Sequence, residues 1–124
     1  MNKVILSGRL TRDAEVTEYG KGKEKSYVAR FSIAVRDGKD AKGNPQAQFI
    51  RCVAFGKLAE LIDDFTEKGQ IITVCGRLKN GSYEDEKDKI TRYTTDVVVE
   101  DLDLFGSSKE DEEEEEKSSK KRHR

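Results

Sequence analysis

A chain of 124 residues suffices for one compact domain but not comfortably for two, and 40% of it is charged against 34% hydrophobic. The last 18 residues hold seven acids and six bases, so the preceding part holds 18 of each and is neutral. This balance excludes an overall positive charge as the source of any polyanion binding, which must come from a local patch.

Apolar, β-rich runs separated by turn residues predict five strands. Residues 15–19 fit a short additional edge strand that leads into a hairpin turn at Gly20 and Gly22. Residues 37–46 are polar and rich in Gly, Asn and Pro, which predicts a loop, and residues 79–91 predict a charged hairpin arm. In chain order, the predicted strands are Lys3–Leu10, Ser26–Arg36, the stretch Gln48–Lys57, Gln70–Leu78 and Arg92–Leu104.

Between the third and fourth strands the hydrophobic period changes to that of a helix. In Lys57–Lys68 the apolar residues recur at helical spacing, the other face is charged, and Gly69 supplies a stop. This predicts one short amphipathic helix whose apolar stripe closes one end of a barrel. The stripe consists of Leu58, Leu61, Ile62 and Phe65.

Five strands with a single short helix between the third and fourth indicate an all-β fold, the OB-fold, which is a five-stranded Greek-key barrel. We expect this domain to span residues 1–106. The segment 107–124 contains KEDEEEEEKSSKKRHR, which cannot bury enough apolar surface to order, so we expect a disordered C-terminal tail.

The stretch QFIRCVAFGK has two different faces. Alternation sends Ile50, Cys52 and Ala54 to one side, which is an ordinary core face. The other side carries Phe49, Arg51, Val53 and Phe55. A buried core rarely accepts an unpaired guanidinium, so this second face is a candidate contact surface.

Other kinds of site find little support in the residues. Cys52 and Cys75 lack metal-binding spacing, and free thiols are the preferred interpretation over a disulfide. The single His123 lies in the tail, so we expect no metal and no cofactor. There is no paired carboxylate, Cys/His arrangement or phosphate loop that favours an enzyme. With no signal peptide or membrane-length apolar run, we expect a soluble, cytoplasmic protein.

Several segments, in order along the chain, resemble the bacterial and phage single-stranded DNA-binding protein family. They are NKVILSGRLTRDAEV (2–16), FSIAV (31–35), FIRCVAFGKLAE (49–60), KGQIITVCGRL (68–78), SYED and RYTTDVVVE. This resemblance implies an OB-fold, usually in a homotetramer, that coats single-stranded DNA without sequence preference and without catalysis. It also implies roles in DNA replication, recombination and repair.

The resemblance also assigns candidate DNA-binding residues. Phe49 and Phe55 match the two stacking aromatics of the third strand, and Arg51 matches a cationic position beside them. Stacking on aromatic faces and tracking of phosphates by cations is how proteins hold single strands without sequence preference. Lys57 is a further matching cation, and the arm contributes Tyr83 with Lys79 close by.

Each assignment has a structural alternative. Phe49 and Phe55 would also suit packing at a barrel rim, and Tyr83 would suit an exposed loop. Four further candidate cations on strands are equally able to pair with acids of neighbouring strands: Lys3, Arg9, Arg77 and Arg92. Tyr27, Phe31 and Tyr93 are expected in the core or in an interface rather than as stacking surfaces.

The sequence departs from the family's pattern in two places. The loop 37–46 lacks an aromatic that the family often carries, so one stacking platform is missing. The tail has an acidic run (111–116), which we expect to compete weakly with DNA. It ends in KKRHR, however, and lacks the terminal hydrophobic pair through which the family recruits replication and repair proteins. An RNA-binding OB domain and a primosomal-type protein-recruitment module are the alternative functions.

Overall fold

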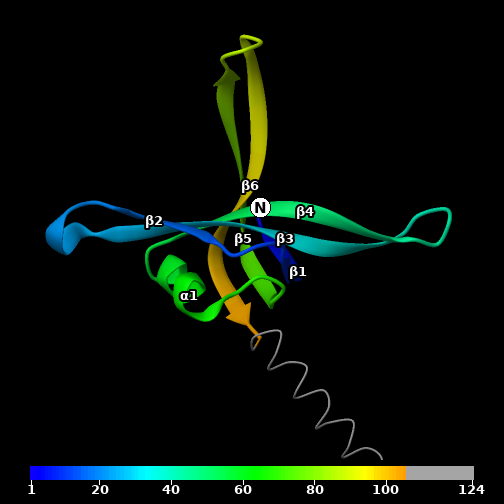
Figure 1. Ribbon diagram of the computed structural model, residues 1–124, viewed down its shortest axis with the longest axis horizontal. Helices are drawn as coiled ribbons and strands as arrows, with labels where there is room; N and C mark the ends of the chain where they lie inside the picture. The colour runs from blue at the N-terminus through cyan, green and yellow to red at the C-terminus, as the bar shows by residue number, and fades with distance from the viewer. Residues whose placement is uncertain (106–124) are drawn as a thin grey trace, which may run out of the picture.

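The computed structural model describes residues 1–105. This range contains six strands, one α-helix and a 3-10 turn at Gly22–Glu24 (Figure 1). The strands and the helix are β1 (Val4–Leu10), β2 (Glu15–Tyr19), β3 (Ser26–Lys39), β4 (Pro45–Phe55), α1 (Lys57–Phe65), β5 (Ile71–Asp85) and β6 (Ile90–Leu104). The predicted domain boundary at residue 106 and the predicted disordered tail (107–124) lie outside the described residues.

Five strands form a closed ring in the order β1-β5-β6-β4-β3, and the pairing of β1 with β3 closes it. Neighbouring strands run antiparallel except β4 and β6, which run parallel with Cys52 beside Val97. β2 lies outside this ring and pairs with β3. The predicted OB-fold barrel, with one helix between its third and fourth strands, is therefore confirmed. The edge segment 15–19 is indeed a strand.

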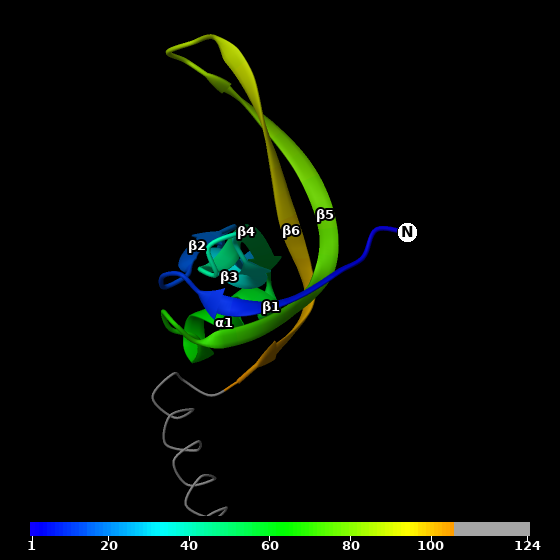
Figure 2. The same cartoon turned by 90° about the vertical axis from the view of Figure 1, so that its right-hand side faces the viewer.

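Three hairpins extend from the barrel: β2–β3, β3–β4 and the long β5–β6 arm (Figures 1 and 2). The loop predicted for 37–46 is wrong in extent, because β3 continues to Lys39 and β4 already begins at Pro45. Residues 36–49 are all exposed, so this part of the hairpin has the polar composition of a loop. The predicted arm is confirmed, and its residues simply prolong β5 and β6.

Asp40 fixes the tip of the β3–β4 hairpin. Its Oδ1 atom accepts hydrogen bonds from the backbone N–H groups of Lys42 and Asn44, each at 2.9 Å. These bonds, the one from Asn44 above all, lower the pKa of the Asp40 carboxyl. The turn is thus organised by one charged side chain that accepts hydrogen bonds from the backbone of the residues that follow it.

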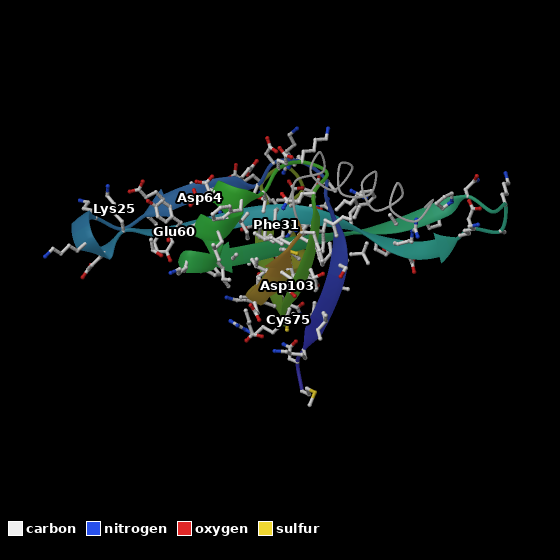
Figure 3. The ribbon with its side chains drawn as sticks, turned by 90° about the horizontal axis from the view of Figure 1, so that it is seen from below. Lys25, Phe31, Glu60, Asp64, Cys75 and Asp103 are labelled. Atoms are coloured by element: carbon white, nitrogen blue, oxygen red, sulfur yellow. The ribbon has the colours of Figure 1, made fainter. Side chains whose placement is uncertain are left out.

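Inward-facing residues of the strands fill the barrel, and α1 packs against β3, β4 and β6. Phe31 lies at the centre, whereas Glu60 and Asp64 lie on the outer side of α1 (Figure 3). The buried cluster comprises Leu10, Ala29, Phe31, Ile33, Cys52, Ala54, Ala59, Ile62, Ile72, Val74, Val97 and Val99.

The helix is shorter than predicted and buries a slightly different face. It ends at Phe65, not at Lys68, because Thr66 is extended and its backbone N–H and hydroxyl both donate to the Ile62 carbonyl. Ala59 and Ile62 form the buried face. Phe65 at the last position is 63% exposed, so its assignment to the packed stripe is wrong.

Two glycines permit close approaches between strands. A Cβ atom on Gly8 would lie 2.5 Å from the carbonyl oxygen of Ala34, where β1 meets β3 to close the ring. A Cβ atom on Gly76 would overlap the carbonyl oxygen of Val98, next to the β-bulge at Cys75 and Gly76. Backbone, not a mobile side chain, occupies the space in both cases, so the neighbour cannot move aside easily.

The two cysteines are free, as predicted, but only Cys52 is buried and Cys75 is half-buried. Burial, and to a lesser degree the nearby Asp96, raises the pKa of the Cys52 thiol to about 12. In residues 1–105, no group of three or more His, Cys, Asp and Glu side chains is placed to hold a metal ion. Within the same range, no helix combines the length and the apolar character that crossing a membrane requires.

We predict that Gly76→Ala lowers the free energy of unfolding by roughly 1–3 kcal/mol, because the new methyl group is forced against the Val98 carbonyl. The matched control is Gly81→Ala on the same strand, whose Cβ would lie 3.0 Å from the Thr94 Oγ1 atom, a side-chain atom that can rotate away. Urea unfolding followed by circular dichroism measures both. Equal stability of the two variants would contradict the close approach at Gly76.

Candidate nucleic-acid interface

The outward face of β4 carries the residues that the alternation of QFIRCVAFGK predicts for it. Phe49 is 70% and Phe55 48% exposed, and Arg51 between them is also exposed. Cys52 and Ala54 on the other face are buried. The two phenylalanines therefore present ring surface to solvent and do not pack into the barrel.

Two hollows open beside this face, with volumes of about 350 Å³ and 210 Å³. Arg30, Val53 and Asp96 line both. These three side chains come from β3, β4 and β6, which are neighbours in the barrel. The first, larger hollow is also lined by Arg12, Glu15 and Arg51, and the second by Phe55, Arg77 and Lys79.

Arg51 and Asp96 form an ion pair at the first hollow, and Asp96 also lines the second. The Nε and Nη2 atoms of Arg51 lie 2.9 Å and 2.8 Å from the Oδ1 atom of Asp96. The parallel pairing of β4 with β6 makes this contact, since it sets Cys52 beside Val97 and hence the two preceding residues beside each other. Exposed pairs of this kind contribute about 0–1 kcal/mol to stability, so a role in orienting Arg51 is more relevant than a role in holding the fold.

The β5–β6 arm continues the same surface. Beyond Gly76 the two strands pair without a further register shift, so Arg77, Lys79 and Tyr83 share one face of the ribbon. Lys79 lies opposite Asp96, and Tyr83, which is 54% exposed, lies opposite Arg92. The structure thus brings the predicted arm residues to the side that carries the hollows.

Tyr93 lies on the other face of the arm, opposite Ser82. It is 80% exposed, so of the two expected places, core or interface, the core is wrong and the interface stays a prediction. Tyr27 is half-buried against the core and Phe31 is buried, as expected. The position of Tyr93 was unpredictable, because the register of an arm depends on its turn and not on the residue's own character.

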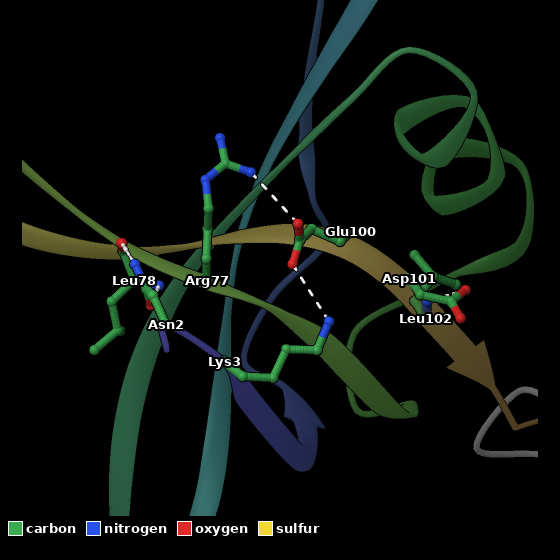
Figure 4. Close-up of polar contacts among 7 residues, drawn as sticks. All are labelled: Asn2, Lys3, Arg77, Leu78, Glu100, Asp101 and Leu102. Atoms are coloured by element: carbon green, nitrogen blue, oxygen red, sulfur yellow. Dashed lines mark hydrogen bonds and ion pairs between the residues drawn. The ribbon is translucent and has the colours of Figure 1, made fainter.

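Besides Arg51, four of the candidate cations have polar partners. Lys3 and Arg77 share the carboxylate of Glu100, at 3.6 Å and 3.7 Å (Figure 4). The nearby Cys75 sulfur, and then Glu100, raise the pKa of Lys3. Two others have separate partners: Arg92 lies 3.2 Å from Asp85 and 3.6 Å from Asp88, and Arg9 donates to the Gly69 carbonyl at 2.9 Å.

Lys57 and Lys79 are exposed, and within residues 1–105 neither has an ion pair. Lys79 lines the second hollow, whereas Lys57 begins α1 two residues after Phe55. Arg9 lies away from both hollows, at a separate hollow of about 600 Å³ that Arg36 also lines. Lys3 lines neither hollow and is linked to Arg77 through Glu100.

Asn2 anchors the chain start beside the arm. Its side-chain amide donates to the Leu78 carbonyl and its Oδ1 accepts from the Leu78 N–H, both at 2.8 Å (Figure 4). This side chain imitates one further residue of the β1–β5 ladder. It therefore holds β5 where the strand leaves the barrel.

Sequence reasoning did not assign Arg30 to the site. The side chain is exposed, lies opposite Val53 in the β3–β4 pairing, and lines both hollows. The outward alternation of Ser26–Arg36 was the available signal, but only the pairing of β3 with β4 places this arginine beside the phenylalanines.

Residues 1–105 match the Single-strand binding protein family. The chain is 46% identical over 108 residues to a Single-stranded DNA-binding protein of Clostridium perfringens, covering 86% of this chain and 67% of that protein. A protein of the same name from Fusobacterium nucleatum is 46% identical over 112 residues, covering 88% and 69%. One from Lactiplantibacillus plantarum is 40% identical over 111 residues, covering 89% and 54%. The family predicted from the sequence is confirmed, and this chain belongs to the single-strand binding protein family.

Proposed function

We propose that this chain binds single-stranded DNA without sequence specificity, through the outward face of β4 and the adjoining face of the β5–β6 arm. The observation that carries the proposal is the exposure of Phe49 and Phe55 on either side of an arginine, next to two hollows lined by further cations. Family membership and the names of the relatives support it.

The physical basis is base stacking supported by charge. Each base stacked on an aromatic side chain contributes roughly 1–3 kcal/mol and does so for any base, since every base has a π-face. Phe49, Phe55 and Tyr83 provide three such platforms, which together would supply several kcal/mol. The cations then need to contribute mainly positioning and attraction, which suits a domain with no net charge.

The biological role that follows is to protect and organise single strands during DNA replication, recombination and repair, by binding and without catalysis. We propose a homotetramer, as the family resemblance implies. The exposed apolar side chains of Ile5 and Leu78 on neighbouring strands suit contacts between copies, and light scattering measures the assembly. The expected cytoplasmic location stays a prediction.

The tail residues of the proposal lie outside the described range. Their acidic run (111–116) would compete with DNA at low salt, because it is tethered to the domain at high effective concentration.

We predict that Phe49→Ala and Phe55→Ala each weaken binding of oligo-dT by roughly 1–3 kcal/mol and leave the fold intact, because each removes one stacking surface. Fluorescence anisotropy measures the affinity and circular dichroism the fold. The control is Phe65→Ala, which removes a ring at the end of α1 whose exposure, 63%, lies between those of Phe49 and Phe55.

Unfolding of the Phe55→Ala variant, with normal DNA binding by the Phe49→Ala variant, would identify these rings as structural and contradict the proposed surface. The alternative functions are tested in the same assay. Tighter binding of oligo-rU than of oligo-dT would favour an RNA-binding domain. Absence of salt-sensitive binding to any single strand would favour protein recruitment.

The two faces of the arm yield a second prediction. Tyr83→Ala should weaken oligo-dT binding by roughly 1–3 kcal/mol, whereas Tyr93→Ala should leave it within about 0.5 kcal/mol of wild type. The two tyrosines lie on one ribbon and face opposite sides, so local stability and composition are matched. A loss of affinity confined to the Tyr93 variant would place the bound DNA on the other face of the arm.

A further inference from the structure

Two arginines flank the centre of the proposed DNA surface. Arg51 lies between the phenylalanines on β4, and Arg30 lies on β3 opposite Val53. Both side chains are exposed, and both line the first hollow. Their position beside the hollow would let either arginine contact a phosphate, but their surroundings differ.

The charge of Arg51 is already balanced. Its Nε and Nη2 atoms both point at the Asp96 Oδ1 atom, at 2.9 Å and 2.8 Å. These two atoms make up one of the edges with which a guanidinium binds phosphate in bidentate fashion. A phosphate that took this edge would also have to approach the Asp96 carboxylate, which lines both hollows and repels it.

Arg30 has no such partner among residues 1–105. Glu15 lies opposite it in the β2–β3 pairing, but the structure records an ion pair of Glu15 with Arg12, at 3.8 Å, and none with Arg30. The first hollow is lined by three arginines and two carboxylates. Once each carboxylate is assigned to its recorded partner, Arg30 holds the remaining positive charge.

We infer that Arg30, and not Arg51, makes the central phosphate contact of this surface, and that Asp96 is the positioning residue responsible. Asp96 holds the Arg51 guanidinium at the first hollow by the edge that carries Nε and Nη2. There its plane is available to bases stacked on Phe49 and Phe55, while its charge is withheld from the phosphates. This inference rests on the proposed binding of single-stranded DNA. It states which arginine contacts phosphate and which residue positions the other arginine.

The different roles of Arg30 and Arg51 should be measurable in the salt dependence of the binding constant. Each phosphate neutralised on a single strand contributes about −0.7 to the slope of log K against log salt. A cation that is paired with a carboxylate both before and after binding contributes nothing. Arg30 and Arg51 should therefore be distinguishable by slope even if both affect affinity.

The experiment measures binding of a short labelled oligo-dT to the full chain by fluorescence anisotropy, from about 50 to about 200 mM salt. Arg30→Gln should make the slope of log K against log salt about 0.7 less steep for each protein chain bound to the oligonucleotide. Over this fourfold range of salt, the fall in the binding constant would then be about 2.6-fold smaller than for the wild type. Arg30→Lys keeps the charge and should retain the wild-type slope. The double variant Arg51→Gln/Asp96→Asn removes the pair without changing net charge and should also retain it.

Asp96→Asn alone should release Arg51 and steepen the slope by about 0.7. Its control is Asp103→Asn, the same change in charge on the same strand but seven residues away, about 20 Å along β6, which should leave the slope unchanged. The inference is overturned if the double variant flattens the slope as much as Arg30→Gln does, or if Arg30→Gln has no effect on it. Absence of oligo-dT binding by the wild-type chain would instead overturn the proposed function, and this inference with it.

Discussion

The architecture depends on one constraint, the inclusion of β4 in a closed ring with hydrogen-bonded neighbours on both sides. A strand held in this way cannot rotate, so every second residue must face the core and every other one must face outward. Cys52 and Ala54 fill the barrel, and Phe49 and Phe55 are consequently displayed to solvent. The same parallel pairing with β6 brings Asp96 to Arg51 and joins the base of the arm to the aromatic face.

Most cations on and near this surface already have a polar partner within the described residues. The domain as a whole is neutral, and ion pairs or carbonyl contacts occupy Arg51, Arg77, Arg92 and Arg9 within the described residues. Arg30, Lys57 and Lys79 are the cations left to act beside the rings. A surface of this kind suits binding in which stacking supplies most of the affinity, with a moderate and not an extreme dependence on salt.

The strands of the barrel, its helix and the outward aromatics were all predictable from period-two alternation and one change to helical period, since these depend on local pattern. The extents of the β3–β4 and β5–β6 hairpins were less predictable, because a strand with both faces exposed to water has the polar amino-acid composition of a loop. The pairing of Arg51 with Asp96 was beyond the sequence, as it joins residues 45 positions apart through a parallel contact. For the same reason the sequence does not place Arg30 beside the phenylalanines, whereas the pairing of β3 with β4 does.

The most direct test of the account is to map where a bound strand lies. Ultraviolet cross-linking of the full chain to bromodeoxyuridine-substituted single strands, followed by mass spectrometry of the peptides, identifies the aromatic side chains in contact with bases. We predict cross-links at Phe49, Phe55 and Tyr83. Cross-links confined to Tyr93 and to the side of β5 that pairs with β1 would contradict the proposed surface, because they would place the bound DNA on the opposite face of the arm.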